Sequence, residues 1–287
     1  MENIKVLFSS TKVLLMDGTA KMASELEVGD VLLAPNRDGR TILEISRQKT
    51  NNYMVIPRYC NSSFIISDSH LFPIIHDTKT FLIDIKTFKL QESKHFFSLI
   101  HEGVEFPSTF VTLEPYFLGL WLSNNNLLRF RKNNEKVYLF LFNFIDKFSL
   151  QHEYDDEFIT IVDSRLLTQF EKYDLFCNPR IPDEYKYNNA VVRSRILAGV
   201  LDNSPVTTNQ IEFTVKKQAT DFCFVIHSLG YLSIMKKKNK SHVVSVIYNN
   251  TSYINDFKVA KIDDDDSIRL KLSGVISGIF LSDFTVI

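Results

Sequence analysis

Hydrophobic positions between Thr11 and Thr112 fall into short runs interrupted by turn signals. Runs such as KVLLMDG, VGDVLLAPNRDGR, YMVIPRY, SFIISDSHLFPII and TFLIDI are rich in β-branched and aromatic residues, which favour strands. Asp17-Gly18 and Asp38-Gly39 lie between such runs, where an Asp-Gly pair favours the tight turn of a β-hairpin. The pattern predicts an all-β block.

The pattern changes at Glu114-Pro115. EPYFLGLWLS places a proline at a first helical turn and apolar residues at helical spacing, and SRLLTQFEKYDLF also has helical periodicity. EFITIVDS, NQIEFTVKK and HVVSVIY alternate like strands, and QATDFCFVIHSLGYL predicts a helix that ends at Gly230. VYLFLFNFIDKF fits a strand or a helix, and IPDEYKYNNAVVRSRILAGVLDN predicts a loop followed by a helix. We expect a mixed α and β block here.

This central block contains an internal repeat. FLGLWLSNN, which begins at Phe117, and ILAGVLDNS, which begins at Ile196, lie about 80 residues apart. Each reads as a helix with small residues, Gly119 or Ala198-Gly199, among large apolar ones. Small residues let two helices approach backbone to backbone, so the repeat predicts two paired helices whose C-terminal ends meet.

The last block, DDDDSIRLKLSGVISGIFLSDFTVI, returns to a β pattern. Asp263 to Asp266 indicate a solvated turn, and IFLSDFTVI is typical of a buried strand.

Composition bounds the class of protein. The chain has 287 residues, of which 45% are hydrophobic, and this length favours two domains. Lys and Arg number 33 against 34 for Asp and Glu, so no global field attracts an anionic partner. Residues 115–240 hold 17 basic and 14 acidic side chains, a local charge of +3 that favours nucleic acid only slightly.

Cysteines and segment hydrophobicity indicate an intracellular, soluble protein. Cys60, Cys177 and Cys223 are scattered and form no C-x-x-C pair, which argues against a disulfide framework or a zinc site. The N-terminus, MENIKVLFSS, lacks the pattern of a signal peptide. No apolar run approaches the roughly 20 residues that span a bilayer, so we expect no membrane partner.

Five segments, in order, resemble inteins that carry a LAGLIDADG homing endonuclease. STKVLLMDGTAKMASELEVGDVLLAPNRDGR is similar to the opening of a Hint splicing domain, and IISDSH is similar to its internal block ending in histidine. EPYFLGLWLSNN and IPDEYKYNNAVVRSRILAGVLDNSP resemble the two LAGLIDADG helices, and IFLSDFTVI resembles the penultimate strand block.

The resemblance implies a discontinuous architecture. An all-β Hint domain would be built from residues 1–113 and 257–287, at the two ends of the chain. An α+β LAGLIDADG domain with two pseudo-symmetric αββαββα-type halves would be inserted at residues 114–256. The resemblance also implies a monomer that works in the nucleus if the host is eukaryotic.

The splicing residues of the family are replaced. Counting back from Ser10-Thr11 puts Val6 at the position of the family's Cys or Ser nucleophile, and valine has no nucleophilic atom. The printed sequence reaches Ile287 where the family continues with His-Asn. His70 corresponds to the histidine that assists the first acyl shift, but without a nucleophile we expect it to be a structural remnant. The pattern predicts no splicing.

The nuclease positions are replaced as well. In active relatives the last acid of each helix binds Mg²⁺, a hard cation that prefers oxygen ligands. The corresponding residues are Asn124 and Ser204, so we expect no metal cofactor here. Asp202 lies two positions earlier, about 200° around the helix axis, and should point elsewhere. A misalignment in which Asp202 and a nearby acid serve instead remains open.

Binding of double-stranded DNA can outlast cleavage. The resemblance implies contacts to phosphates and base edges from the strands of the central domain. The candidates are Arg129, Arg131, Lys132, Lys216, Lys217, Lys236, Lys237 and Lys238. Each is equally typical of a solvated surface. Three hypotheses follow: a degenerate DNA-binding relative, a Mg²⁺-dependent endonuclease with atypical ligands, and a non-catalytic interaction protein or decaying mobile element.

Overall fold

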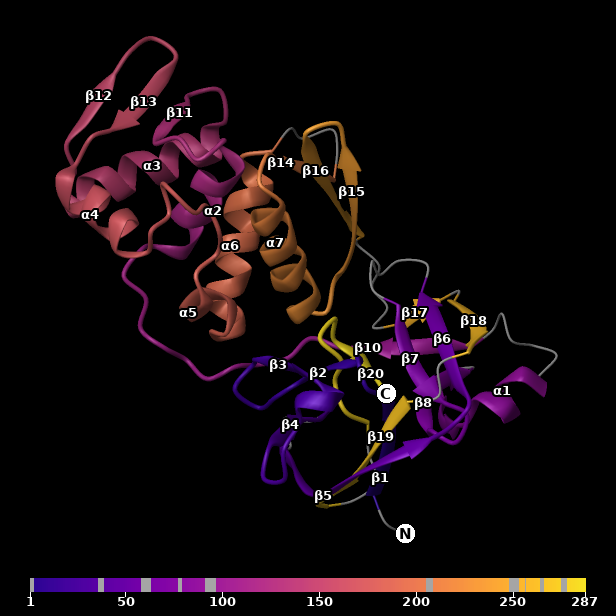
Figure 1. Ribbon diagram of the computed structural model, residues 1–287. Helices are drawn as coiled ribbons and strands as arrows, with labels where there is room; N and C mark the ends of the chain where they lie inside the picture. The colour runs from indigo at the N-terminus through magenta and orange to yellow at the C-terminus, as the bar shows by residue number, and fades with distance from the viewer. Residues whose placement is uncertain are drawn as a thin grey trace. The chain divides into compact units, whose positions relative to one another are not determined.

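The computed structural model describes residues 3–35, 39–57, 63–76, 79–90, 97–204, 209–247, 253–255, 257–263, 266–274 and 278–287. The chain is mostly β, with several sheets and some helices (Figure 1). It divides into two compact units. Unit 1 comprises residues 1–105, 227–232 and 248–287, and unit 2 comprises residues 106–226 and 233–247.

Unit 1 is built on a seven-stranded sheet in the order β18-β6-β7-β1-β19-β5-β4. Its strands are β1 (Asn3–Phe8), β4 (Val31–Leu33), β5 (Gly39–Lys49), β6 (Asn52–Pro57), β7 (Phe64–Ser67), β18 (Phe257–Ile262) and β19 (Asp266–Leu272). β1 is antiparallel to β19, with Val6 opposite Arg269. Strands from the two ends of the chain therefore share the centre of one sheet.

A second sheet of unit 1 runs in the order β17-β10-β8-β9, with β20 also paired to β10. Its strands are β8 (Phe72–His76), β9 (Lys79–Ile83), β10 (Ser98–His101), β17 (Tyr253–Asn255) and β20 (Thr285–Val286). The smaller elements are the hairpin of β2 (Lys12–Leu14) and β3 (Ala20–Met22), the 3₁₀ turn η1 (Ala23–Glu25) and helix α1 (Ile85–Leu90).

Turn chemistry explains the β2–β3 hairpin. Gly18 adopts a φ of +87°, which costs a residue without a Cβ nothing, and the Asp17 side chain accepts a hydrogen bond from the Thr19 amide at 2.9 Å. The predicted turn at Asp17-Gly18 is confirmed. Asp38 lies outside the described residues.

Unit 2 contains two halves with the same element order. The first runs α2 (Pro115–Ser123), β11 (Arg129–Arg131), α3 (Glu135–Phe148), β12 (His152–Tyr154) and β13 (Phe158–Ile161). The second runs α6 (Ala190–Asp202), β14 (Gln210–Phe213), α7 (Lys216–Ser228), β15 (Leu232–Lys238) and β16 (Ser241–Ile247). α4 (Ser164–Lys172) and α5 (Asp183–Lys186) connect them, and the sheet orders β11-β13-β12 and β14-β16-β15 are equivalent.

The described halves follow αβαββ, so the expected αββαββα order is wrong in the first half. Only ten residues separate the last residue of α2 from Asn134, whose side chain caps α3 by accepting from the Val137 amide at 3.2 Å. That length accommodates one short strand, β11, and not a pair. The ambiguous VYLFLFNFIDKF segment is helix α3, because Val137, Leu141 and Phe144 then share one buried face.

Three further expectations need correction. Lys216 and Lys217 open helix α7 and do not end strand β14. Residues 279–287 form a buried turn-back and not one strand: Leu281 donates to Thr285 O at 2.8 Å, and Phe284 takes a φ of +66° between them. The block expected to be all-β also contains helix α1.

Other sequence features lie as follows. Gly230 follows α7 with a φ of +86°, where the pattern ends that helix. Cys177 and Cys223 are free thiols, and Cys60 lies outside the described residues. Among the described residues, no helix is long and apolar enough to cross a membrane.

Candidate functional site

In unit 1, the ring of His70 lies against the backbone of Val6. His70 follows β7 and is 2% exposed. Its Nδ1 is 3.2 Å from the Val6 amide nitrogen and 3.0 Å from the Val6 carbonyl oxygen. Its Nε2 is buried without a hydrogen-bond partner among the described residues. The structure thus brings together two residues that lie 64 positions apart in the sequence.

The electrostatics of this contact keep the imidazole neutral. Burial, and secondly the charge of Lys5, hold the pKa of His70 well below its ordinary value. A neutral ring carries one proton, so Nδ1 either accepts from the Val6 amide or donates to the Val6 carbonyl. The first arrangement holds the ring on the Lys5–Val6 peptide unit, and the second holds it on the next peptide unit, Val6–Leu7.

Lys5 links the junction, by which we mean the Lys5–Val6 peptide bond and the His70 ring beside it, to residue 287. Its ammonium group donates to Ile287 O at 3.1 Å and to Leu71 O at 3.3 Å, and burial lowers the pKa of Lys5 to about 8. Ile287 is held in turn by two backbone hydrogen bonds to Ile279, at 2.8 and 2.9 Å. β1, the loop after β7 and residue 287 therefore converge on one buried peptide bond. His70 lies against this peptide bond, and the Val6 side chain has no nucleophilic atom.

In unit 2, α2 and α6 cross backbone to backbone at Gly119 and Gly199. A Cβ built on Gly119 would lie 2.3 Å from Ile196 O, and one built on Gly199 would lie 2.1 Å from Tyr116 O. The repeat spacing of 80 residues relates both glycines and both carbonyls. Just beyond the crossing, Asn203 Nδ2 donates to Ser123 Oγ at 3.1 Å, so the two helix ends are joined.

The two candidate metal positions hydrogen-bond to backbone carbonyls. Asn124 Nδ2 donates to Leu127 O at 2.9 Å and to Arg129 O at 2.8 Å, which ties the end of α2 to β11. Ser204 Oγ donates to Val200 O at 2.7 Å. Both side chains thus have structural roles at equivalent places in the repeat.

Asp202 is directed to other partners. Its carboxylate accepts from the Tyr116 hydroxyl at 2.8 Å and pairs with Lys136 Nζ at 2.6 Å. Burial, and secondly the hydrogen bond to this carboxylate, raise the pKa of the Tyr116 hydroxyl. Asp202 therefore tethers α6 to α2 and α3.

A polar hollow of 430 Å³ lies at the ends of α2 and α6. It is lined by Ser123, Asn125, Asn203, Ser204, Gln210, Ile211, Glu212, Thr214, Lys238 and Val243. Glu212 is the one carboxylate among these described lining residues and accepts a hydrogen bond from the Ser241 hydroxyl. Sequence reasoning missed Glu212, although the alternation of QIEF places it on the outer face of β14. Among the described residues, no group of three or more His, Cys, Asp or Glu side chains could hold a metal.

The cationic candidates differ in their contacts. In the first half, Arg129 pairs with Asp155 at 2.7 Å, and Lys132 Nζ donates to Asp155 O at 2.6 Å. The guanidinium groups of Arg129 and Arg131 lie 4.1 and 5.5 Å from the Phe158 ring centroid. In the second half, Lys217 pairs with Asp221 at 2.8 Å. Lys216, Lys236, Lys237 and Lys238 are exposed.

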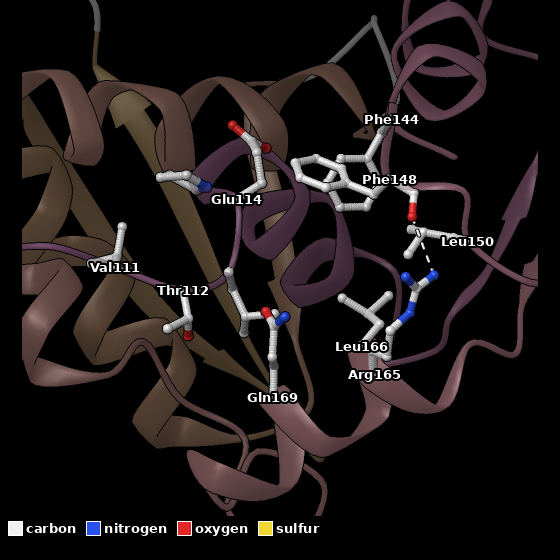
Figure 2. A pocket seen from close by; sticks show the side chains of 11 residues that line it. Val111, Thr112, Glu114, Phe144, Phe148, Leu150, Arg165, Leu166 and Gln169 are labelled. Atoms are coloured by element: carbon white, nitrogen blue, oxygen red, sulfur yellow. Dashed lines mark hydrogen bonds between the residues drawn. The ribbon is translucent and has the colours of Figure 1, made fainter. Parts of the chain in front are cut away.

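A second cavity of unit 2, of 370 Å³, lies between the start of α2, the end of α3 and α4 (Figure 2). Phe144, Phe148, Leu150 and Leu166 give it a largely apolar lining. Its charged groups are already engaged. Glu114 accepts from the Phe117 amide at 2.7 Å and pairs with Arg195, and Arg165 binds Asp163 and the carbonyls of residues 148 and 149. The sequence patterns gave no sign of this cavity.

The similarity of this chain to known proteins is limited. No family model and no curated protein matches the chain. Among solved structures, the chain is similar to the crystal structure of the gp41-1 intein, at 25% identity, and to a variant of that intein with three substitutions, at 24% identity. Each comparison covers 34% of this chain and 68% of the other, with a TM-score of 0.27.

Proposed function

We propose that this chain is an intein-like Hint domain that has lost splicing, with an inserted LAGLIDADG-like domain that binds double-stranded DNA without cutting it. The observation that carries the proposal is the paired state of α2 and α6. The glycine crossing is intact, and the two residues at its functional end, Asn124 and Ser204, donate to backbone carbonyls. The scaffold of a two-half site is kept, and the acids that would bind metal are not there.

Loss of cleavage follows from the charge at the helix ends. Mg²⁺ keeps a near-octahedral shell of hard oxygen ligands and is held through carboxylates. The neutral side chains of Asn124 and Ser204, which already donate to carbonyl oxygens, are weak ligands for Mg²⁺. The Asp202 carboxylate is bound by Tyr116 and Lys136. Glu212 supplies a single carboxylate, bonded to Ser241. We therefore expect the hollow to bind no catalytic Mg²⁺.

DNA binding is supported by exposed cations on the strands of unit 2. Salt-sensitive contacts to phosphates supply most of the affinity of proteins for duplexes, and Lys236, Lys237 and Lys238 are exposed on one strand. The binding test is retention of a random duplex library at two salt concentrations, with and without Mg²⁺. We expect retention that falls with salt and no cut ends. Cut ends only with Mg²⁺ would establish an endonuclease, and no retention at low salt would leave an interaction protein or a decaying element.

The junction in unit 1 has its own test. In the variant Val6→Cys, the new thiol can attack the Lys5 carbonyl carbon, so that a thioester forms and the residue-6 nitrogen leaves as an amine. An added thiol then releases residues 1–5, carried on an N-terminal fusion partner so that the cleavage is visible on a gel. We expect cleavage in Val6→Cys, much less in Val6→Cys/His70→Ala, and none in wild type, because valine has no nucleophilic atom. Equal cleavage with and without His70 would contradict an intein-like junction.

A further inference from the structure

The equivalent outer hairpins of the two halves of unit 2 carry opposite charge. The β12–β13 hairpin, residues 152–161, has four acidic residues and no Lys or Arg, whereas β15–β16, residues 232–247, has four lysines and no acidic residue. Both hairpins occupy the same place in equivalent three-stranded sheets. The exposed acids are Glu153, Asp155, Asp156 and Glu157, and the exposed lysines are Lys236, Lys237, Lys238 and Lys240.

In the acidic hairpin, the nearby cations are already engaged. Asp155 pairs with Arg129 at 2.7 Å, and its backbone oxygen accepts from Lys132 at 2.6 Å. The same carboxylate accepts the amides of Glu157 and Phe158 at 2.9 and 2.7 Å, so it is fixed in the turn. Among the described residues, the other three acids form no salt bridge, so they add uncompensated negative charge. The remaining cation of the neighbouring strand β11, Arg131, lies 5.5 Å from the Phe158 ring centroid. This end of unit 2 should repel a polyanion.

The lysine hairpin has the opposite character. Within the part of the chain that the structure describes, Lys236, Lys237 and Lys238 form no salt bridge. Lys238 lines the hollow at the helix ends, and the alternation of β15 places Lys236 on the same face. Figure 1 shows the two hairpins on opposite sides of unit 2, with α2 and α6 between them.

We propose that unit 2 holds duplex DNA from one side only, through the β15–β16 hairpin and the adjoining hollow. A duplex carries about one negative charge per 1.7 Å of its axis. In a site that spanned both sheets, the phosphates would lie close to the four carboxylates of the β12–β13 hairpin and be repelled by them. Contact limited to the second half avoids this repulsion. The inference rests on the proposed DNA binding and adds that the site is a half-site of about one helical turn, about 10 base pairs.

Duplex length and matched charge variants test this proposal in the full chain. We expect duplexes of about 12 and about 24 base pairs to bind with affinities within about 3-fold of each other, after correction for the number of sites. Lys236→Gln/Lys237→Gln/Lys238→Gln should weaken binding by about 100-fold at low salt and reduce the slope of log K against log salt by about 3. Arg131→Gln, the control in the first half, should change affinity less than 2-fold.

A gain-of-binding variant gives the sharpest outcome. Glu153→Gln/Asp156→Asn/Glu157→Gln removes three charges and keeps Asp155, which holds the turn. It should lengthen the minimal duplex to about 20 base pairs and raise affinity for it by about 10-fold. Trp121 fluorescence verifies that each variant is folded.

Each contrary result has a defined meaning. No binding of any duplex at low salt refutes the proposed function itself. Retained binding in which Arg131→Gln costs as much as the variant Lys236→Gln/Lys237→Gln/Lys238→Gln refutes only the one-sided site. The same holds if the longer duplex binds more than about 10-fold tighter. Salt-sensitive self-association of the free chain, lost in the lysine variant, would identify a second copy as the ligand of the lysine hairpin and would also overturn it.

Discussion

Gly119 and Gly199 lie so close together that a Cβ atom built on either one would be 3.1 Å from the Cα of the other. The nearest atoms to each such Cβ are backbone oxygens, which side-chain rotation cannot move. The α2–α6 crossing therefore depends on glycine at both positions. Since the same 80-residue step relates the glycines and their contacts, neither half can repack without the other.

Gly119→Ala and Gly199→Ala should each destabilise unit 2 by about 3 kcal/mol, because the helices must separate to admit the methyl group. Urea unfolding followed by Trp121 fluorescence measures this, since Trp121 is the chain's single tryptophan and is fully buried in α2. Ala198→Gly is the control on the neighbouring residue and should cost about 1 kcal/mol through helix propensity alone. Equal costs for all three variants would contradict the close crossing.

Acidic residues restored at the helix ends should create a metal response. Without metal, Asn124→Asp/Ser204→Asp should be about 3 kcal/mol less stable than wild type, because hydrogen bonds are lost and a carboxylate faces the carbonyls of Leu127 and Arg129. Millimolar Mg²⁺ should raise its melting temperature by several degrees and leave wild type unchanged.

The matched control for this metal response is Asn125→Asp/Asn203→Asp, which adds the same charge to two residues that line the polar hollow together with Ser204. It should show no Mg²⁺ response. If the control responds as strongly as the test variant, the assignment of Asn124 and Ser204 as the lost ligand positions is wrong.

Local signals predicted much of the secondary structure. The Asp17-Gly18 turn, the end of α7 before Gly230 and the 80-residue spacing of the two glycine-bearing helices could all be predicted from short stretches, because turn geometry and helix packing impose residue types locally. Helix α3 was ambiguous because its apolar residues also alternate, and the strand number of each half depended on a loop length that the resemblance did not supply.

Long-range contacts could not be predicted in the same way. The resemblance related Val6 and His70 to splicing positions, but their 3.2 Å contact and the bond from Lys5 to Ile287 depend on sheet register over 64 and 282 residues. The hollow that Glu212 lines and the apolar cavity beside Phe144 are each formed by several elements. Both were missed because no single one of these elements has a side-chain pattern that indicates a site. The opposite charges of the two hairpins could not be compared from the sequence, because the comparison requires the equivalence of their two sheets.

Lys5 should limit stability at neutral pH. Burial lowers its pKa from the ordinary 10.5 to about 8, so between these values the unfolded chain binds a proton that the folded chain does not. Stability should therefore rise by about 3 kcal/mol as pH increases from 8 to 10.5, and the full cost of the buried charge is present below pH 8.

Lys5→Met tests this effect by removing the charge. It should be more stable than wild type at pH 7, by up to about 2 kcal/mol after the loss of the hydrogen bonds to Leu71 and Ile287, and should lose the rise above pH 8. Urea unfolding followed by circular dichroism at pH 7 and pH 10 provides the comparison. Lys12→Met, on the exposed position of β2, is the control and should leave the pH dependence intact.

Two buried histidines should make unit 1 sensitive to acid. His101 is fully buried in β10, with Nε2 3.2 Å from Tyr231 O, and burial lowers its pKa to about 4, while the pKa of His70 is also lowered by burial. Both are neutral in the folded chain and gain a proton on unfolding below the ordinary pKa of 6.5. For His101 alone, stability should therefore fall by about 3 kcal/mol between pH 6.5 and 4.

His101→Gln should remove its share of this loss, even if the variant is less stable at pH 7, because the slope of stability against pH depends only on proton uptake. His242→Gln, in β16 of unit 2, is the control. Circular dichroism follows the unfolding of the whole chain. An unchanged slope in His101→Gln, or the same change in His242→Gln, would show that the buried imidazole in β10 is not the source of the acid sensitivity.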